Sequence, residues 1–163
     1  MTRLRGRAPC GQRLVDKVPH GKWQMTTVIA GIRADGVVAP FALTGAMDAA
    51  TFESYIEQIL VPCLRPGDIV VLDRLSAHRG RAVGRAVRKV GAGLWYLPPY
   101  SPDYNPIEMI WSKVKGALRG VKARSTELLW EALPAAVKTV TAQDCRHCFR
   151  HCGYSAALVR EAL

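Results

Sequence analysis

The sequence lacks any long apolar run, and this absence argues against a membrane protein. No stretch approaches the roughly 20 apolar residues that a membrane-spanning helix needs. Arg3, Arg5 and Arg7 lie near the N-terminus, but Pro9 and Gly11 follow where a signal peptide requires an apolar segment. We therefore expect a cytoplasmic location and no membrane partner.

Acidic residues are also scarce, since 13 Asp and Glu stand against 23 Lys and Arg, for a net charge of +10. Such a charge favours polyanionic partners, nucleic acid above all, although a merely basic protein is the alternative. Residues 81, 85 and 88 would share one face of a helix because their spacing follows the helical repeat. The predicted DNA contacts are Arg79, Arg81, Arg85, Arg88, Lys113, Lys115 and Arg119.

The sequence has five cysteines, an odd number that cannot all pair in disulfides, and three of them lie close together. Cys145, Cys148 and Cys152 alternate with His147 and His151 in a pattern that suggests zinc ligands. A structural zinc site usually draws two pairs of ligands from separate segments, whereas these residues share one predicted helix. Reduced thiols are the favoured interpretation, and a small zinc-binding module is the rival one.

A chain of 163 residues is typical of one domain that can bury a core without disulfides. We divide it into a basic segment (1–24), a main domain (25–154) and a tail (155–163). The hydrophobic patterns predict strands over 12–18, 25–33, 37–43, 68–73 and 94–97, and helices over 48–61, 79–90, 106–118, 126–140 and 141–152. Residues 25–43 are predicted to form a hairpin with a turn at Ala34-Asp35-Gly36, in which Pro40 indicates an edge position or a bulge. Asp48 is the predicted cap of the helix that follows. The order predicts an α/β fold with a mixed sheet flanked by helices.

Two carboxylates stand where such folds place functional groups. Asp73 ends a buried strand, and the carboxyl ends of strands collect binding and catalytic residues in α/β sheets. Glu108 lies in the first turn of a helix that Pro106 opens. Taken singly, Asp73 is typical of a turn or a helix cap. Glu108 alone is typical of a carboxylate that stabilises the N-terminus of its helix.

Their surroundings carry a more specific signal. The segment YLPPYSPDYNPIEMIWSKVK (residues 96–115) resembles a motif of DDE-type transposases, the bacterial insertion-sequence enzymes related to the Tc/mariner superfamily. Asp73, followed by Ser76-Ala77-His78, resembles the second acidic motif of these enzymes. The 34 residues between Asp73 and Glu108 match the spacing in that group. The resemblance extends over about residues 11–154.

The resemblance implies a ribonuclease H-like fold, N-terminally truncated, and a two-metal site. Asp73 and Glu108 would be its catalytic and metal-binding residues, with Mg²⁺ or Mn²⁺ as cofactor. The implied activity is DNA cleavage at transposon ends followed by strand transfer into target DNA. Two metal ions about 4 Å apart can activate the attacking group and stabilise the leaving oxygen, and hard cations prefer carboxylate ligands.

Two departures from the family pattern qualify this expectation. Arg74 occupies a position where the family usually has Asn, and it could clamp a phosphate or compete with a metal ion. The first acidic motif is missing, since the early acids Asp16 and Asp35 do not match it. We expect the chain alone to be inactive, with the product of an upstream reading frame or a homo-oligomer as partner. The alternative is a non-catalytic nucleic-acid-binding remnant.

Three other residues near these motifs have two interpretations each. His78 serves either as a catalytic group or as a structural loop residue. Tyr100 and Tyr104 either stack on bases or pack within their proline-rich loop.

Overall fold

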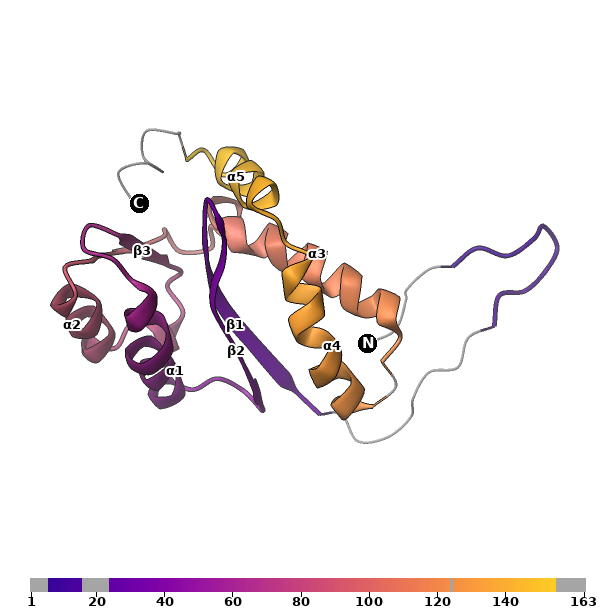
Figure 1. Cartoon of the computed structure of the whole chain (residues 1–163), viewed down its shortest axis with the longest axis horizontal. Helices are drawn as coiled ribbons and strands as arrows, with labels where there is room; N and C mark the ends of the chain where they lie inside the picture. The colour runs from indigo at the N-terminus through magenta and orange to yellow at the C-terminus, as the bar shows by residue number, and fades with distance from the viewer. Residues whose placement is uncertain (1–5, 16–23, 124, 155–163) are drawn as a thin grey trace.

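The computed structural model describes residues 6–15, 24–123 and 125–154, and it confirms most of the expected elements (Figure 1). Residues 12–15 are not in a strand, so that part of the strand expected over 12–18 is wrong, while the rest of it and the tail lie outside the described residues. The strands are β1 (Thr26–Arg33), β2 (Gly36–Thr44), β3 (Ile69–Leu72) and β4 (Gly93–Tyr96). The main helices are α1 (Ala49–Tyr55), α2 (Arg81–Lys89), α3 (Pro106–Val121), α4 (Thr126–Lys138) and α5 (Ala142–His151). None of the described helices is long and apolar enough to span a membrane.

The hairpin of β1 and β2 contains a bulge at the position where Pro40 predicted one. Ile29 pairs with Phe41 and Gly31 with Val38, so β2 carries one more residue than β1 over this interval. Ala39 takes up the irregularity with a φ of +50°. Pro40 fits there because a residue without a backbone N–H is tolerated at a bulge.

Because of the bulge, apolar side chains from both strands of the hairpin face the same group of helices. Val28 and Ile32 on β1, with Val37 and Ala42 on β2, all pack against the core made by α3, α4 and α5. Residues 28 and 32 are an even number apart, whereas 37 and 42 are an odd number apart. The extra residue of β2 restores the common face, because side chains alternate along a strand.

The α1 region departs from the regular helix that its apolar spacing predicts. Asp48 caps α1, as expected, by accepting a hydrogen bond from the Thr51 N–H at 2.8 Å. After Tyr55 the chain continues as a π-helical turn η1 (Ile56–Leu60) and a 3-10 turn η2 (Val61–Cys63). The ring of Pro62 and its missing N–H are incompatible with a continuing α-helix. The wider turn still buries Ile56 and Leu60.

Two hydrophobic cores lie on opposite sides of the hairpin (Figure 1). The core on the side of α1, α2, β3 and β4, the strand-side core, contains Ala39, Phe52, Tyr55, Ile56, Leu60, Val83, Val87 and Ala92. The core on the side of α3, α4 and α5, the helical core, contains Ile110, Val114, Leu118, Leu133, Ala136, Cys145 and Cys148. The hairpin therefore acts as the shared wall of both.

The strands form two separate pairs in the described part of the chain. β1 and β2 are antiparallel, and β3 and β4 are parallel. Both strand orientations expected of a mixed sheet are present, but no hydrogen-bonded ladder joins the two pairs. Asp73 follows directly after β3, so its position is set by the parallel pair.

Candidate active site

Asp73 and Glu108 line the same cavity, which has a volume of about 490 Å³. Asp73 leaves the carboxyl end of β3, and its side chain is 38% exposed. Glu108 lies in the first turn of α3 and is exposed. The structure therefore brings to one cavity two carboxylates that 34 residues separate in the sequence.

Neighbouring groups hold one oxygen of the Asp73 carboxylate in place. The Oδ1 atom lies 2.6 Å from the His78 Nδ1 and accepts a hydrogen bond from the Leu75 N–H at 3.1 Å. The His78 ring stacks on the buried Phe52 ring with centroids 4.1 Å apart, and the Tyr96 hydroxyl donates to the His78 carbonyl at 3.0 Å. His78 therefore contacts Asp73 directly, while Asp73 Oδ2 has no partner among the described residues.

The chemistry of the two carboxylates suits a hard divalent cation. Among the described residues the Glu108 carboxylate has no hydrogen-bond or ion-pair partner, so its oxygens are available as ligands. Mg²⁺ characteristically takes one or two protein carboxylates and completes its shell with water and substrate phosphate. Within the same part of the chain, no group of three or more His, Cys, Asp or Glu side chains is arranged to hold a metal ion. The residues present fit part of a magnesium site.

The cysteines of α5 belong to the helical core. Cys145 and Cys148 are buried there, and Cys152 is buried just beyond the end of α5. Burial, with a smaller contribution from Cys148, raises the pKa of the Cys145 thiol to about 11. Burial also raises the pKa of Cys148 and Cys152. These thiols are therefore neutral packing groups near pH 7.

The basic residues of α2 share the outer face of that helix, as their spacing predicts. Arg81, Arg85 and Arg88 are exposed, while Val83 and Val87 on the opposite face are fully buried. Arg79, just before the helix, is exposed as well. This face leaves its charges accessible to a large polyanion.

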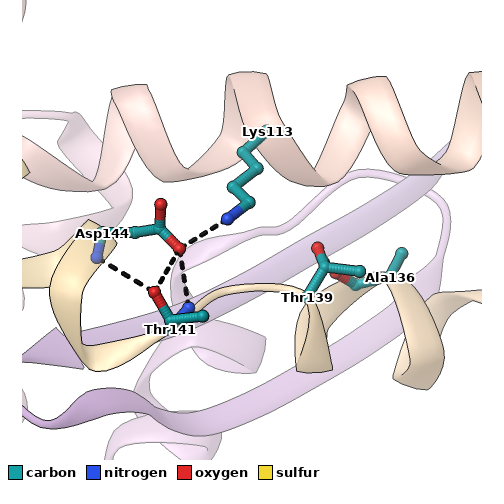
Figure 2. Close-up of polar contacts among 5 residues, drawn as sticks. All are labelled: Lys113, Ala136, Thr139, Thr141 and Asp144. Atoms are coloured by element: carbon teal, nitrogen blue, oxygen red, sulfur yellow. Dashed lines mark hydrogen bonds and ion pairs between the residues drawn. The ribbon is translucent and has the colours of Figure 1, made fainter.

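The basic residues of α3 differ from one another in their surroundings. Lys115 is exposed and Arg119 is partly buried. The Lys113 Nζ instead lies 2.5 Å from Asp144 Oδ2, and this ion pair fastens α3 to the beginning of α5 (Figure 2). The charge of Lys113 is thus locally compensated, a contact that the sequence analysis missed.

Asp144 makes further contacts that define the beginning of α5. Its Oδ2 accepts hydrogen bonds from the Thr141 N–H at 2.8 Å and from the Thr141 hydroxyl at 2.7 Å (Figure 2). In return, the Asp144 N–H donates to the Thr141 hydroxyl. The hydrogen bond from Lys113, followed by those from Thr141, holds the pKa of Asp144 well below its usual range. The Thr-x-x-Asp spacing is the sequence signal that could have revealed this cap.

Exposed cationic and aromatic side chains stand near both carboxylates in the sequence. Arg74, directly after Asp73, is exposed. In the loop before α3, Tyr100 is fully exposed with a φ of +54°, and Tyr104 is 55% exposed. Packing within the loop does not bury these tyrosine rings, so they are accessible to a stacking partner.

Comparison with protein families and curated relatives gives a consistent result. Residues 1–129 match the family described as DDE superfamily endonuclease. The chain is similar to the Tcb1 transposable element transposase of Caenorhabditis briggsae, with 27% identity over 144 residues that cover 82% of this chain and 52% of the relative. The Tcb2 transposase of the same organism is 29% identical over 102 residues, covering 56% of this chain and 37% of that protein. The chain thus spans about half or less of the length of these relatives.

Solved structures confirm the expected fold class. The Mos1 strand transfer complex matches with a TM-score of 0.70 at 16% identity, covering 99% of this chain and 50% of that one. The Mos1 mariner paired end complex with Mn matches with a TM-score of 0.66 at 15% identity, covering 99% of this chain and 51% of that one. These likenesses support the ribonuclease H-like α/β architecture.

Proposed function

The chain belongs to the DDE superfamily of endonucleases, and from that premise we propose that it forms part of a metal-dependent site for DNA transposition. The proposed reactions are cleavage of phosphodiester bonds at transposon ends and transfer of the cut strand into target DNA. The observation that carries this proposal is that Asp73 and Glu108 line one cavity from the end of β3 and the first turn of α3.

In the proposed site, Asp73 and Glu108 would hold Mg²⁺ or Mn²⁺. Bound divalent cations would supply activation of a water or 3′-hydroxyl group and stabilisation of the leaving oxygen. The chain's own residues would orient the metal ligands. His78 and the Leu75 N–H hold Asp73 Oδ1, which leaves Asp73 Oδ2 for coordination of a cation. His78 is therefore a positioning residue, because it acts through Asp73.

We assign DNA backbone contacts to the exposed cations. Arg81, Arg85 and Arg88 on α2, with Arg79 before it and Lys115 on α3, are accessible to phosphates. Arg119 is a weaker candidate because it is partly buried, and Lys113 is weaker still because Asp144 compensates its charge. Contacts of this kind bind DNA with little sequence preference and weaken steeply as salt increases.

The two-carboxylate arrangement requires a further ligand from outside the described residues. Two carboxylates can bind one cation loosely, but positioning two cations across one phosphate requires an additional bridging group. The product of an upstream reading frame or a second copy of the chain could supply it. We therefore expect the described residues by themselves to bind metal weakly and not to cut DNA.

Manganese binding to the isolated chain tests the ligand assignment. We expect Asp73→Asn and Glu108→Gln each to lower Mn²⁺ affinity at least about tenfold, measured by electron paramagnetic resonance of free Mn²⁺. Glu131→Gln is the matched control, because Glu131 is an exposed carboxylate on α4 that does not line the cavity. Equal affinity for all four proteins would refute the site.

The role of His78 is tested in the same assay. We expect His78→Ala to weaken Mn²⁺ binding about tenfold, since groups that orient metal ligands typically have effects of this size. His78→Asn retains a donor for Asp73 and should recover part of the affinity. A thermal melt of both variants separates this effect from loss of the Phe52 stacking contact. If both substitutions change stability equally and leave Mn²⁺ affinity unchanged, His78 is only structural.

DNA cleavage tests the complete proposal. A longer chain with an upstream segment ending in Asp-Glu should cut a transposon-end duplex in Mg²⁺, and Asp73→Asn should abolish the cut. The isolated chain should bind DNA without cutting it. The alternative function, a non-catalytic nucleic-acid-binding remnant, is favoured by the exposed basic face of α2. It would be established if the longer chain bound DNA and never cut it.

A further inference from the structure

The helix that carries Glu108 begins without a side-chain cap. Asn105 is the N-cap residue of α3, and its side chain makes no capping hydrogen bond with the described residues. The chain enters the helix through the 3-10 turn η4 (Pro102–Tyr104), which follows a proline-rich loop. Side-chain caps normally fix how the chain enters a helix, so the direction of the first turn of α3 depends on contacts from elsewhere in the fold.

One such contact comes from a residue 50 positions further along the chain. The Tyr154 hydroxyl donates a hydrogen bond to the Tyr104 carbonyl at 3.0 Å. Tyr104 is the last residue of η4 and directly precedes the N-cap of α3, so this bond lies at the junction between loop and helix. Glu108 follows only four residues later, in the first turn of the helix.

The end of α5 has the geometry that directs Tyr154 to this junction. Gly153 has a φ of +85°, and its N–H donates to the Arg150 carbonyl at 3.1 Å. The Tyr154 N–H donates to the Phe149 carbonyl at 3.0 Å. These two hydrogen bonds define a Schellman motif, in which the residue after the glycine commonly packs against the last turn of the helix. Here the Tyr154 ring meets the Phe149 ring edge-on, with centroids 5.7 Å apart.

α5 is itself fastened to α3, so it can serve as a fixed support for Tyr154. The ion pair of Lys113 and Asp144 joins the beginning of α5 to α3 (Figure 2). The Tyr154 hydroxyl joins the other end of α5 to the residue that precedes the cap of α3. Contacts on both sides of Glu108 in the sequence, at Tyr104 and at Lys113, therefore tie the first turns of α3 to α5.

The two aromatic rings at the end of α5 also border the cavity that contains Glu108. Phe149 and Tyr154 line this cavity together with residues 105–108. Burial, with a smaller contribution from Cys152, raises the pKa of the Tyr154 hydroxyl. The hydroxyl is therefore protonated at neutral pH and can act as a hydrogen-bond donor.

We propose that Tyr154 is a positioning residue for Glu108, through the hydrogen bond from its hydroxyl to the Tyr104 carbonyl. This bond fixes the junction before α3, and the junction fixes the direction in which the first turn presents the Glu108 carboxylate to a bound cation. The proposal rests on the proposed function, because it requires Glu108 to be a metal ligand. It gives a part in the site to α5, which lies outside the residues 1–129 that match the endonuclease family.

A purely structural role for Tyr154 is the alternative, and the two roles predict different results. A hydrogen bond that only closes the helical core would change stability and leave the Mn²⁺ affinity unchanged. A positioning bond changes both, because groups that orient metal ligands alter metal affinity. Loss of one neutral hydrogen bond typically changes an equilibrium constant about two- to tenfold, so an effect of that size is expected.

Tyr154→Phe in the full chain tests the proposal, because it removes the hydroxyl and keeps the ring beside Phe149. We expect the Mn²⁺ affinity, measured by electron paramagnetic resonance of free Mn²⁺, to fall about two- to tenfold. The amide nitrogen resonance of Asn105 should shift in two-dimensional NMR, since the Tyr104 carbonyl and the Asn105 N–H belong to one peptide group. An unchanged Asn105 resonance would show that the hydrogen bond is not formed, and would overturn the proposal.

Tyr55→Phe is the matched control. It removes a hydrogen bond of the same kind, from the Tyr55 hydroxyl to the Ala39 carbonyl at 2.9 Å, in the strand-side core. This variant should lower the melting temperature and leave both the Mn²⁺ affinity and the Asn105 resonance unchanged. An equal loss of Mn²⁺ affinity in both variants would assign the Tyr154 effect to a general loosening of the fold, and would overturn the proposal.

A double-mutant cycle with Glu108→Gln separates this proposal from the proposed function. If Tyr154 acts through Glu108, adding Tyr154→Phe to Glu108→Gln should lower the Mn²⁺ affinity no further. A further loss equal to that in the unsubstituted chain overturns the positioning role. Weaker binding by Glu108→Gln but not by Tyr154→Phe overturns this proposal alone. Unchanged binding by Glu108→Gln overturns the proposed metal site and the positioning role with it.

Discussion

The two cores on either side of the hairpin differ in how completely the elements around them satisfy their backbone hydrogen bonds. In the helical core, α3, α4 and α5 satisfy their own backbone hydrogen bonds and pack around Ile110, Val114 and Cys145. In the strand-side core, Phe52, Tyr55 and Ile56 are buried as deeply, yet they also line the cavity that contains Asp73 and Glu108. Helices complete their hydrogen bonding locally, whereas a strand edge requires a partner. The comparison shows that two regions with similarly buried side chains can differ greatly in how completely their backbone hydrogen bonds are satisfied.

The ion pairs of the two regions differ in the same way. Arg33 and Asp68, beside the strand-side core, have side chains that are 13% and 5% exposed. Lys113 and Asp144, beside the helical core, are 41% and 31% exposed. The desolvated pair cannot lose one partner without leaving a buried charge, whereas water can replace either partner of the exposed pair.

The largest expected effect is therefore loss of the buried pair. Asp68→Ala should lower the free energy of unfolding by about 3–5 kcal/mol, because Arg33 is left without a counter-charge. Urea unfolding followed by circular dichroism measures this change. The double variant Arg33→Met with Asp68→Leu should recover much of the loss. A cost below about 1 kcal/mol for Asp68→Ala would show that the surroundings of the Arg33–Asp68 pair are well hydrated, and would remove the contrast between the two pairs.

The next effect compares two isoleucines of nearly equal burial. Ile110 in the helical core is 2% exposed, and Ile56 in the strand-side core is 0% exposed. We expect Ile110→Ala to cost about 4 kcal/mol and Ile56→Ala about 2 kcal/mol in unfolding free energy. The difference arises because Ile56 already borders a cavity, so its truncation enlarges an existing void. Ile→Val at each position is the graded control, and equal costs for the two alanine variants would contradict the comparison.

The smallest effect concerns the exposed pair and its dependence on pH. The pKa of Asp144 is lowered in the folded chain, so its stabilising contribution is present above the ordinary carboxylate value of about 3.9 and is lost as pH falls through the folded value. Asp144→Asn should therefore lower the melting temperature slightly at pH 7. The difference in melting temperature between Asp144→Asn and the unsubstituted chain should become smaller in acid. A difference that grows as the pH falls would contradict this assignment.

Much of the local structure could be predicted from the sequence because its signals are short-range. The tight turn after Arg33, the Asp48 cap and the Pro106 helix start each depend on a few neighbouring residues, and each was found. The π-helical turn before Pro62 was missed, since the apolar spacing of an α-helix and of a helix with one wide turn differ little. The Thr141–Asp144 cap was overlooked although its signal was present.

The candidate site likewise combines features that the sequence predicts with features that only the fold creates. The sequence by itself determined that Asp73 and Glu108 are the candidate metal ligands, because their motifs resemble those of the DDE transposases. It also determined that the α2 arginines share one face, because their spacing follows the helical repeat. Only the tertiary structure decided that His78 holds Asp73, that Asp144 holds Lys113, and that Arg33 pairs with Asp68. The last two contacts join residues 31 and 35 positions apart in the chain. Such partners are chosen by how the elements pack, and no local pattern encodes that choice.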